Sequence, residues 1–157
     1  MEIINARTED EIYREVCDFL RRYPLTITWR IRQHSKIVAK HLNDEENIYY
    51  IFAAQRNPNS LNIFSTAIIA FTNKRIMIVQ KRVLWGYNMV SITPDMFNDF
   101  EVYKGLIFGK LDIDTIKEQI RLSDIDPKAL IEIEANLSDY LVQVKPKLGG
   151  IVETTNY

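Results

Sequence analysis

The sequence has few of the residues that active-site chemistry usually requires. Among 157 residues there is one cysteine, Cys17, and there are two histidines, His34 and His41. A single cysteine excludes a disulfide within the chain, so a reducing compartment is the simplest setting. The histidines are seven residues apart, about 10 Å along a helix, too far to bind one metal ion together. We interpret both as surface or boundary residues and expect no metal, no cofactor and no catalytic residue.

Long apolar runs are also missing. Apolar stretches such as residues 48–54 and 67–71 are far shorter than the ~20 residues that a membrane-spanning helix needs. The first residues lack the basic start and apolar run of a signal peptide, and no glycine-rich phosphate loop is present. These features predict a cytoplasmic protein that is not an enzyme and has no small-molecule substrate.

The residues that are abundant indicate a folded domain. Apolar residues make up 46% of the chain, enough to bury a core, and 157 residues suit one domain with a short appendage. The formal net charge is −1, which argues against nucleic acid as a partner.

The chain divides into a helical zone, a strand zone and a last helix. Thr8 and Glu11 form a capping box before a helical pattern of apolar residues. Residues 25–33 fit either a strand or a helix, and we favour a helix as far as about Leu42. Asp126 and Pro127 are typical of a helix start, and an apolar stripe then follows as far as Lys145. The boundaries expected are a helical extension over 1–43, a domain over 44–146 and a flexible tail over 147–157.

The strand zone, about residues 47–122, contains closely spaced apolar runs separated by turn residues. The expected strands cover residues 47–55, 64–72, 74–81, 83–92, 100–103, 106–113 and 118–122. Because no helix separates them, we expect antiparallel pairing and an α+β fold with a barrel or sandwich. Ile76 and Ile78 share a strand face and should point inward, beside Ile68 and Ala70.

Ordered motifs in this zone resemble a known family. Residues 70–78 read AFTNKRIMI, and WGY at 85–87, SITPD at 91–95 and GLIFGK at 105–110 follow in order. This set resembles bacterial pleckstrin-homology (PH) domain proteins over about residues 42–145. The resemblance implies a PH-like antiparallel barrel of about seven strands, capped by the last helix, acting as a binding module. Some eukaryotic relatives bind phosphoinositides through clustered bases in the first loop between strands. Here that loop, Gln55 to Ser60, has only Arg56, so we expect no phosphoinositide site there.

Charge is unevenly distributed along the chain. Residues 21–94 carry eleven bases and three acids, a net charge of +8, whereas residues 95–139 carry eleven acids and five bases, a net charge of −6. The basic zone could be an exposed binding face, or the two zones could neutralise one another within the fold or between subunits. The sequence leaves this open.

Two functions are consistent with these features. The first is a scaffold that binds a protein partner or a second copy of itself, for example through an open strand edge. The alternative is a peripheral module that binds an anionic membrane surface. The candidate binding residues are Arg30, Arg32, Lys36, Lys40, Lys81 and Arg82.

Overall fold

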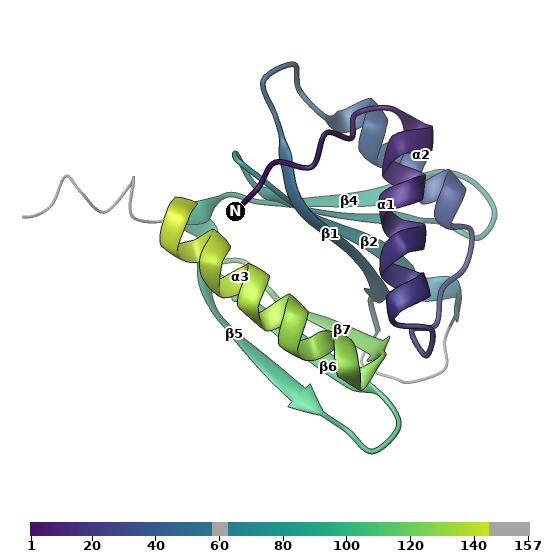
Figure 1. Cartoon of the computed structure of the whole chain (residues 1–157), viewed down its shortest axis with the longest axis vertical. Helices are drawn as coiled ribbons and strands as arrows, with labels where there is room; N and C mark the ends of the chain where they lie inside the picture. Colours follow the sequence, from purple (N-terminus) through teal and green to yellow (C-terminus); the bar gives the residue numbers. More distant parts are fainter. Residues whose placement is uncertain (58–62, 145–157) are drawn as a thin grey trace, which may run out of the picture.

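A computed structural model describes residues 1–57 and 63–144 of the chain. Within these ranges it contains three α-helices, seven strands and three short 3₁₀ turns (Figure 1). The elements in chain order are α1 Glu9–Arg22, α2 Ile31–His41, β1 Ile48–Gln55, η1 Ile63–Ser65, β2 Thr66–Thr72, β3 Ile76–Lys81, β4 Tyr87–Ile92, η2 Pro94–Met96, β5 Phe97–Lys104, β6 Gly109–Thr115, β7 Gln119–Ile125, η3 Pro127–Ala129 and α3 Leu130–Val144.

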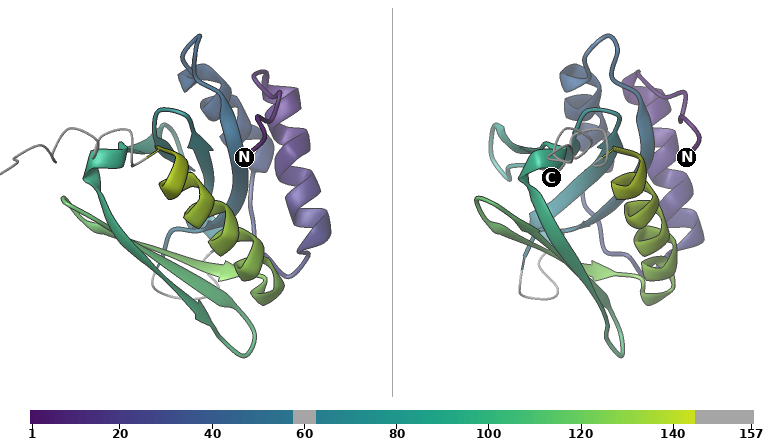
Figure 2. Two further views of the ribbon diagram at one scale, coloured as in Figure 1. Left: turned by 60° about the vertical axis from the view of Figure 1, so that its left-hand side comes forward. Right: turned by 90° about the vertical axis from the view of Figure 1, so that its left-hand side faces the viewer.

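The strands form one antiparallel sheet in the order β4-β3-β2-β1-β7-β6-β5. Among the described residues, only the Gln55–Ser123 pair joins β1 to β7, so the sheet consists of a four-stranded and a three-stranded half. The two halves are splayed, and α3 lies across the opening between them (Figure 2). The expected α+β fold with seven antiparallel strands, a last helix and helices at the N-terminus is confirmed.

Both faces of the sheet are buried at β2. Every residue of β2 is buried, because α1 and α2 cover one face and α3 closes the barrel interior on the other (Figure 2). Ile76 and Ile78 do point into the barrel interior as expected. The expected neighbours were wrong, however: Ile76 pairs with Phe71 and Ile78 with Ile69.

The segment between α1 and α2 is neither the helix nor the strand that its sequence allows. The backbone N–H of Leu25 donates to the Asp126 carboxylate at 3.2 Å, and the Asp126 N–H donates to the Thr26 hydroxyl at 3.0 Å. The Ile27 N–H donates to the Asp124 carbonyl at 3.1 Å. The start of the last helix therefore holds this segment in an irregular conformation, and α2 begins only at Ile31.

Both predicted helix starts are confirmed. Thr8 and Glu11 form the complete capping box of α1, and the Asp126 side chain accepts a hydrogen bond from the Lys128 N–H ahead of α3. Tyr140 of α3 is buried and packs near Phe71, with ring centroids 5.4 Å apart. Lys145 and the expected tail over 147–157 lie outside the described residues. No helix in the described ranges is long and apolar enough to span a membrane.

Candidate functional site

Three of the six candidate bases line one groove between α2 and the β3–β4 hairpin. Arg30 is the residue before α2, Lys36 lies on its exposed face, and Lys81 ends β3. The groove has a volume of about 610 Å³. Its other lining residues are Gln33, Ile37, Leu84, Gly86 and Tyr87.

Two further candidates lie beside this groove. The Cδ atom of Arg82 lies 3.8 Å from the position that a Cβ atom would take on Gly86, so this exposed side chain runs along the hairpin turn. Lys40 is exposed one helical turn after Lys36 and therefore lies on the same face of α2. We call Arg30, Lys36, Lys40, Lys81 and Arg82 the basic groove.

Arg32 is the candidate that the structure separates from the others. Its guanidinium lies 2.6 Å from the Asp10 carboxylate and 3.9 Å from that of Glu9, and it stacks 4.2 Å from the centre of the Tyr13 ring. These contacts hold it against α1. The three residues that it contacts lie some twenty positions earlier in the chain. No local sequence pattern reveals these contacts.

The β3–β4 turn adds exposed apolar side chains to the edge of the groove. A strand was expected from Val83, but β4 begins at Tyr87, and Gly86 takes a φ of +77°, which a turn rather than a strand requires. The Lys81 ammonium donates to the Gly86 carbonyl at 3.0 Å and closes this turn. Leu84 and Trp85 at its tip are 78% and 75% exposed.

Arg30 connects the start of α2 to the same turn. Its guanidinium donates to the Val83 carbonyl at 3.2 Å and stacks 4.0 Å from the centre of the Trp29 ring. The Trp29 ring in turn meets Phe64 edge-on, with centroids 5.1 Å apart. The half-buried Trp29 and the exposed Phe64 therefore provide apolar surface beside Arg30.

His34 lies buried beneath the groove, so its interpretation as a surface or boundary residue was wrong. Its Nδ1 atom is 2.7 Å from the Arg30 carbonyl oxygen, and its Nε2 atom is 2.8 Å from the Thr66 carbonyl oxygen and 3.1 Å from the Lys81 backbone nitrogen. Burial lowers the pKa of the ring, and the charges of Lys81 and Arg30 lower it further, against the effect of the two carbonyl contacts.

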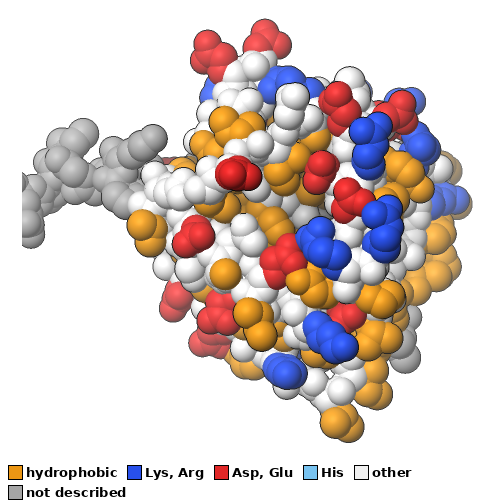
Figure 3. Space-filling model, in the orientation of Figure 1, with side chains coloured by type: hydrophobic (Ala, Val, Ile, Leu, Met, Phe, Trp, Pro, Cys, Tyr) orange, Lys and Arg blue, Asp and Glu red, His pale blue; other side chains and the backbone are white. Residues whose placement is uncertain are grey.

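Some charges of the basic zone are neutralised by the acidic zone, whereas, among the described residues, those of the basic groove are not. Arg22 pairs with Glu132 at 2.6 Å and Arg56 with Glu118 at 3.3 Å, and both pairs join the basic zone to the acidic zone. In the described part of the chain, no carboxylate lies within ion-pair distance of the basic groove. Acidic and basic side chains are interspersed over the face that carries α1 and α3 (Figure 3).

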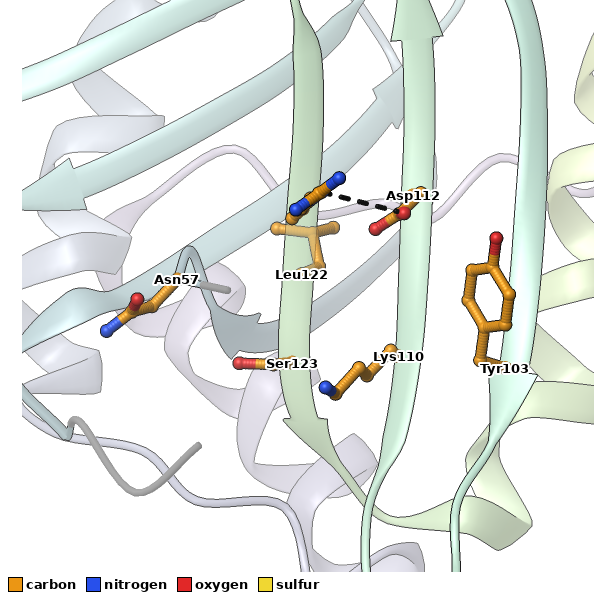
Figure 4. A pocket seen from close by; sticks show the side chains of 7 residues that line it. Asn57, Tyr103, Lys110, Asp112, Leu122 and Ser123 are labelled. Carbon is orange, nitrogen blue, oxygen red and sulfur yellow. Dashed lines mark ion pairs between the residues drawn. The ribbon is translucent and has the colours of Figure 1, made fainter. Parts of the chain in front are cut away.

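A second hollow lies on the outer face of the three-stranded half, near the first loop between strands (Figure 4). It is smaller, about 240 Å³, and Arg121 lies 3.8 Å from Asp112 within it. Arg56, the one base of that loop, is already paired with Glu118. Residues 58–62 of the loop lie outside the described ranges. Charge pairing makes this hollow a weaker anion site than the basic groove.

Over residues 1–57 and 63–144, no three side chains of His, Cys, Asp or Glu come together as a metal site. The site is thus defined by cations and apolar groups. What it can do chemically is attract anions while offering apolar contact beside them.

A comparison with known protein families agrees with the resemblance seen in the motifs. A family model described as "Bacterial PH domain" matches residues 42–137. Among solved structures, the chain is similar to a DUF1696 family protein with a pleckstrin-homology domain from Shewanella loihica PV-4, with 14% identity, a TM-score of 0.47, and coverage of 69% of this chain and 91% of that chain. No curated protein matches the chain. The β3–β4 hairpin lies inside the matched range and α2 lies outside it.

Proposed function

This chain belongs to the bacterial PH domain family, a family of binding domains, and we propose that it binds anionic membrane surfaces through the basic groove and the tip of the β3–β4 hairpin. It acts as a docking module and not as an enzyme. Of the two functions expected from the sequence, the geometry favours the alternative over the protein scaffold, with the basic groove as its binding face.

The observation that carries this proposal is the position of Lys81 and Arg30 beside Leu84 and Trp85. A cation near an anionic leaflet contributes about 1 kcal/mol, and five of them give an attraction that salt weakens. An indole ring prefers the membrane–water interface, where its apolar body and N–H group are both satisfied. Burying the exposed Leu84 adds up to about 2 kcal/mol.

Vesicle co-sedimentation tests the proposal. We expect the chain to sediment with vesicles of phosphatidylcholine and phosphatidylglycerol at low salt, to be released at high salt, and to ignore pure phosphatidylcholine. Lys36 and Lys40 are both exposed, so exchanging them for glutamate reverses two groove charges and should abolish binding. Lys74 and Lys117 are exposed outside the groove, in the turns after β2 and β6, so Lys74→Glu combined with Lys117→Glu changes the net charge equally and is the matched control. It should reduce binding only slightly.

Absence of binding to the anionic vesicles at low salt would overturn the proposal. Equal loss in the double control variant and in the groove variant would also overturn it, because binding would then depend on net charge and not on this site.

A further inference from the structure

The two free edges of the sheet differ in how they are protected. In the strand order, β4 and β5 stand at the ends, and neither has a second neighbouring strand within the described residues. An unprotected edge presents a row of backbone donors and acceptors to another strand, and proteins usually block it with charges, prolines or bulges.

The β5 edge carries such protection. Asp99, Glu101 and Lys104 are exposed along it, and its pairing with β6 is irregular between Phe97 and Asp99. The Asp99 carboxylate also accepts the Phe100 backbone N–H at 2.8 Å. A strand added here would meet charges and a donor that is already used.

The β4 edge carries none of these devices. Its six residues, YNMVSI, include no charged residue and no proline. Their pairing with β3 is regular from Ile76–Ile92 to Lys81–Tyr87. Gly86, the residue before β4, sits in the turn rather than within the strand, so the strand itself is an uninterrupted, uncharged ladder.

The register shows which backbone groups of β4 face outward. The Arg82 N–H donates to the Gly86 carbonyl at 3.1 Å, so the Gly86 carbonyl points across the hairpin toward the β3 side. Because antiparallel pairs alternate, Asn88, Val90 and Ile92 bond to β3. The N–H and C=O groups of Tyr87, Met89 and Ser91 therefore point away from it, toward the free edge.

We propose that the β4 edge pairs with β4 of a second copy of this chain, antiparallel and across a two-fold axis at Met89. A two-fold axis perpendicular to the sheet keeps the same face of both copies on the same side. Odd-numbered residues must therefore stand opposite odd-numbered residues, and even-numbered opposite even-numbered. Among such registers, the one centred on Met89 pairs all three outward-facing residues of β4, with Tyr87 opposite Ser91 of the second copy. The occupant is another β4 because an uncharged ladder meets no like charge when it pairs with itself.

This pairing has a consequence for the groove. The two four-stranded halves would form one continuous eight-stranded sheet with both copies of α2 on the same face. The two basic grooves would then face the same way. Binding of one groove to a membrane would raise the effective concentration of the other groove at that membrane. The pairing itself does not depend on membrane binding, so either can fail alone.

Sedimentation equilibrium of the full chain in the absence of lipid tests the pairing. We expect a monomer–dimer equilibrium that Met89→Pro weakens about 30-fold, because each copy loses one outward N–H worth about 1 kcal/mol. The β3 ladder keeps its bonds, since that N–H does not face it. Val102→Pro makes the same change on the β5 edge and is the matched control, which should dimerise like the parent.

A second pair of variants covers the case in which proline disrupts the fold, as judged by circular dichroism and thermal melting. Met89→Lys places two ammonium groups at the two-fold axis and should give a monomer, whereas Val102→Lys should not. A parent chain that stays monomeric at every concentration overturns the proposal. So does a dimer that the β5 variants weaken and the Met89 variants leave intact.

Discussion

His34 takes the place of a ladder bond between β2 and β3. The register of these strands, extended by two residues from Ile68–Val79, would set Thr66 opposite Lys81. Instead the Nε2 atom of His34 lies 2.8 Å from the Thr66 carbonyl oxygen, and 3.1 Å from the Lys81 nitrogen. One buried ring thus joins α2, which lies outside the matched family region, to the two strands that support the groove.

We expect His34→Ala to destabilise the fold by about 3 kcal/mol. The substitution leaves a cavity and removes the ring from the buried Thr66 carbonyl and the Lys81 N–H. The free energy of unfolding, from urea titration followed by circular dichroism, measures the effect. His41→Ala is the matched control, because His41 is only half-buried and contacts the Tyr87 hydroxyl. A loss below about 1 kcal/mol in the His34 variant would contradict a structural role.

Stability should fall as the pH decreases below the ordinary histidine pKa of 6.5. Burial lowers the pKa of His34 in the folded chain, so the unfolded chain binds the proton more tightly and acid favours unfolding. The loss begins near pH 6.5 and continues down to the folded pKa, with a slope of up to about 1.4 kcal/mol per pH unit. The pKa of His41 is shifted in the same direction, so the His34→Ala variant should lose only part of this slope. An unchanged slope in that variant would contradict the assignment.

Glu46→Gln should destabilise the fold by about 3 kcal/mol. Glu46 is fully buried, and its carboxylate accepts hydrogen bonds from Arg75 at 2.8 and 3.0 Å and from the Thr72 hydroxyl at 2.8 Å. Burial alone would raise the pKa of Glu46, but the bonds from Arg75 and Thr72 outweigh it and lower the pKa. Breaking such a pair leaves Arg75 without its counter-ion.

A double-mutant cycle with Arg75→Met, followed by urea unfolding, separates the pair from the burial of each group. Coupling below about 0.5 kcal/mol would mean that the two residues act independently.

Trp85→Ser should weaken binding to anionic vesicles about tenfold, because the exposed indole is lost from the interface. The free energy of unfolding should remain within about 0.5 kcal/mol of the parent, since Trp85 is 75% exposed. Vesicle titration and urea unfolding of the same variant check both expectations. Leu106→Ser, at the fully exposed tip between β5 and β6, is the control. Equal losses of binding in both variants would point to general apolar adsorption.

Much of the strand pattern could be predicted because it depends on near neighbours. Turn residues and short apolar runs placed all seven strands in order, and the caps at Thr8 and Asp126 are made by atoms a few residues away. The errors lie where distant residues compete. The 25–30 segment takes its shape from Asp124 and Asp126, about a hundred residues further on.

The candidate site was predicted in part for the same reason. A count of bases along the chain found the basic groove, because α2 and the β3–β4 turn each concentrate cations locally. The count could not exclude Arg32 from the candidate residues, because the contact of its guanidinium with Asp10 on another helix is not visible in the sequence. It also could not find His34, because a histidine at an apolar helix position is buried or exposed according to what packs against it.

The sequence by itself therefore determined the family, the order of the strands and the starts of the first and last helices, since short-range caps, turns and periodicity encode them. Tertiary structure alone decided which cations share a groove, which histidine is buried, and which sheet edge is left without charge. Those outcomes depend on how α1 and α2 pack on one face of the sheet and α3 on the other. That packing sums weak contacts between residues far apart in the chain, and no local pattern contains it.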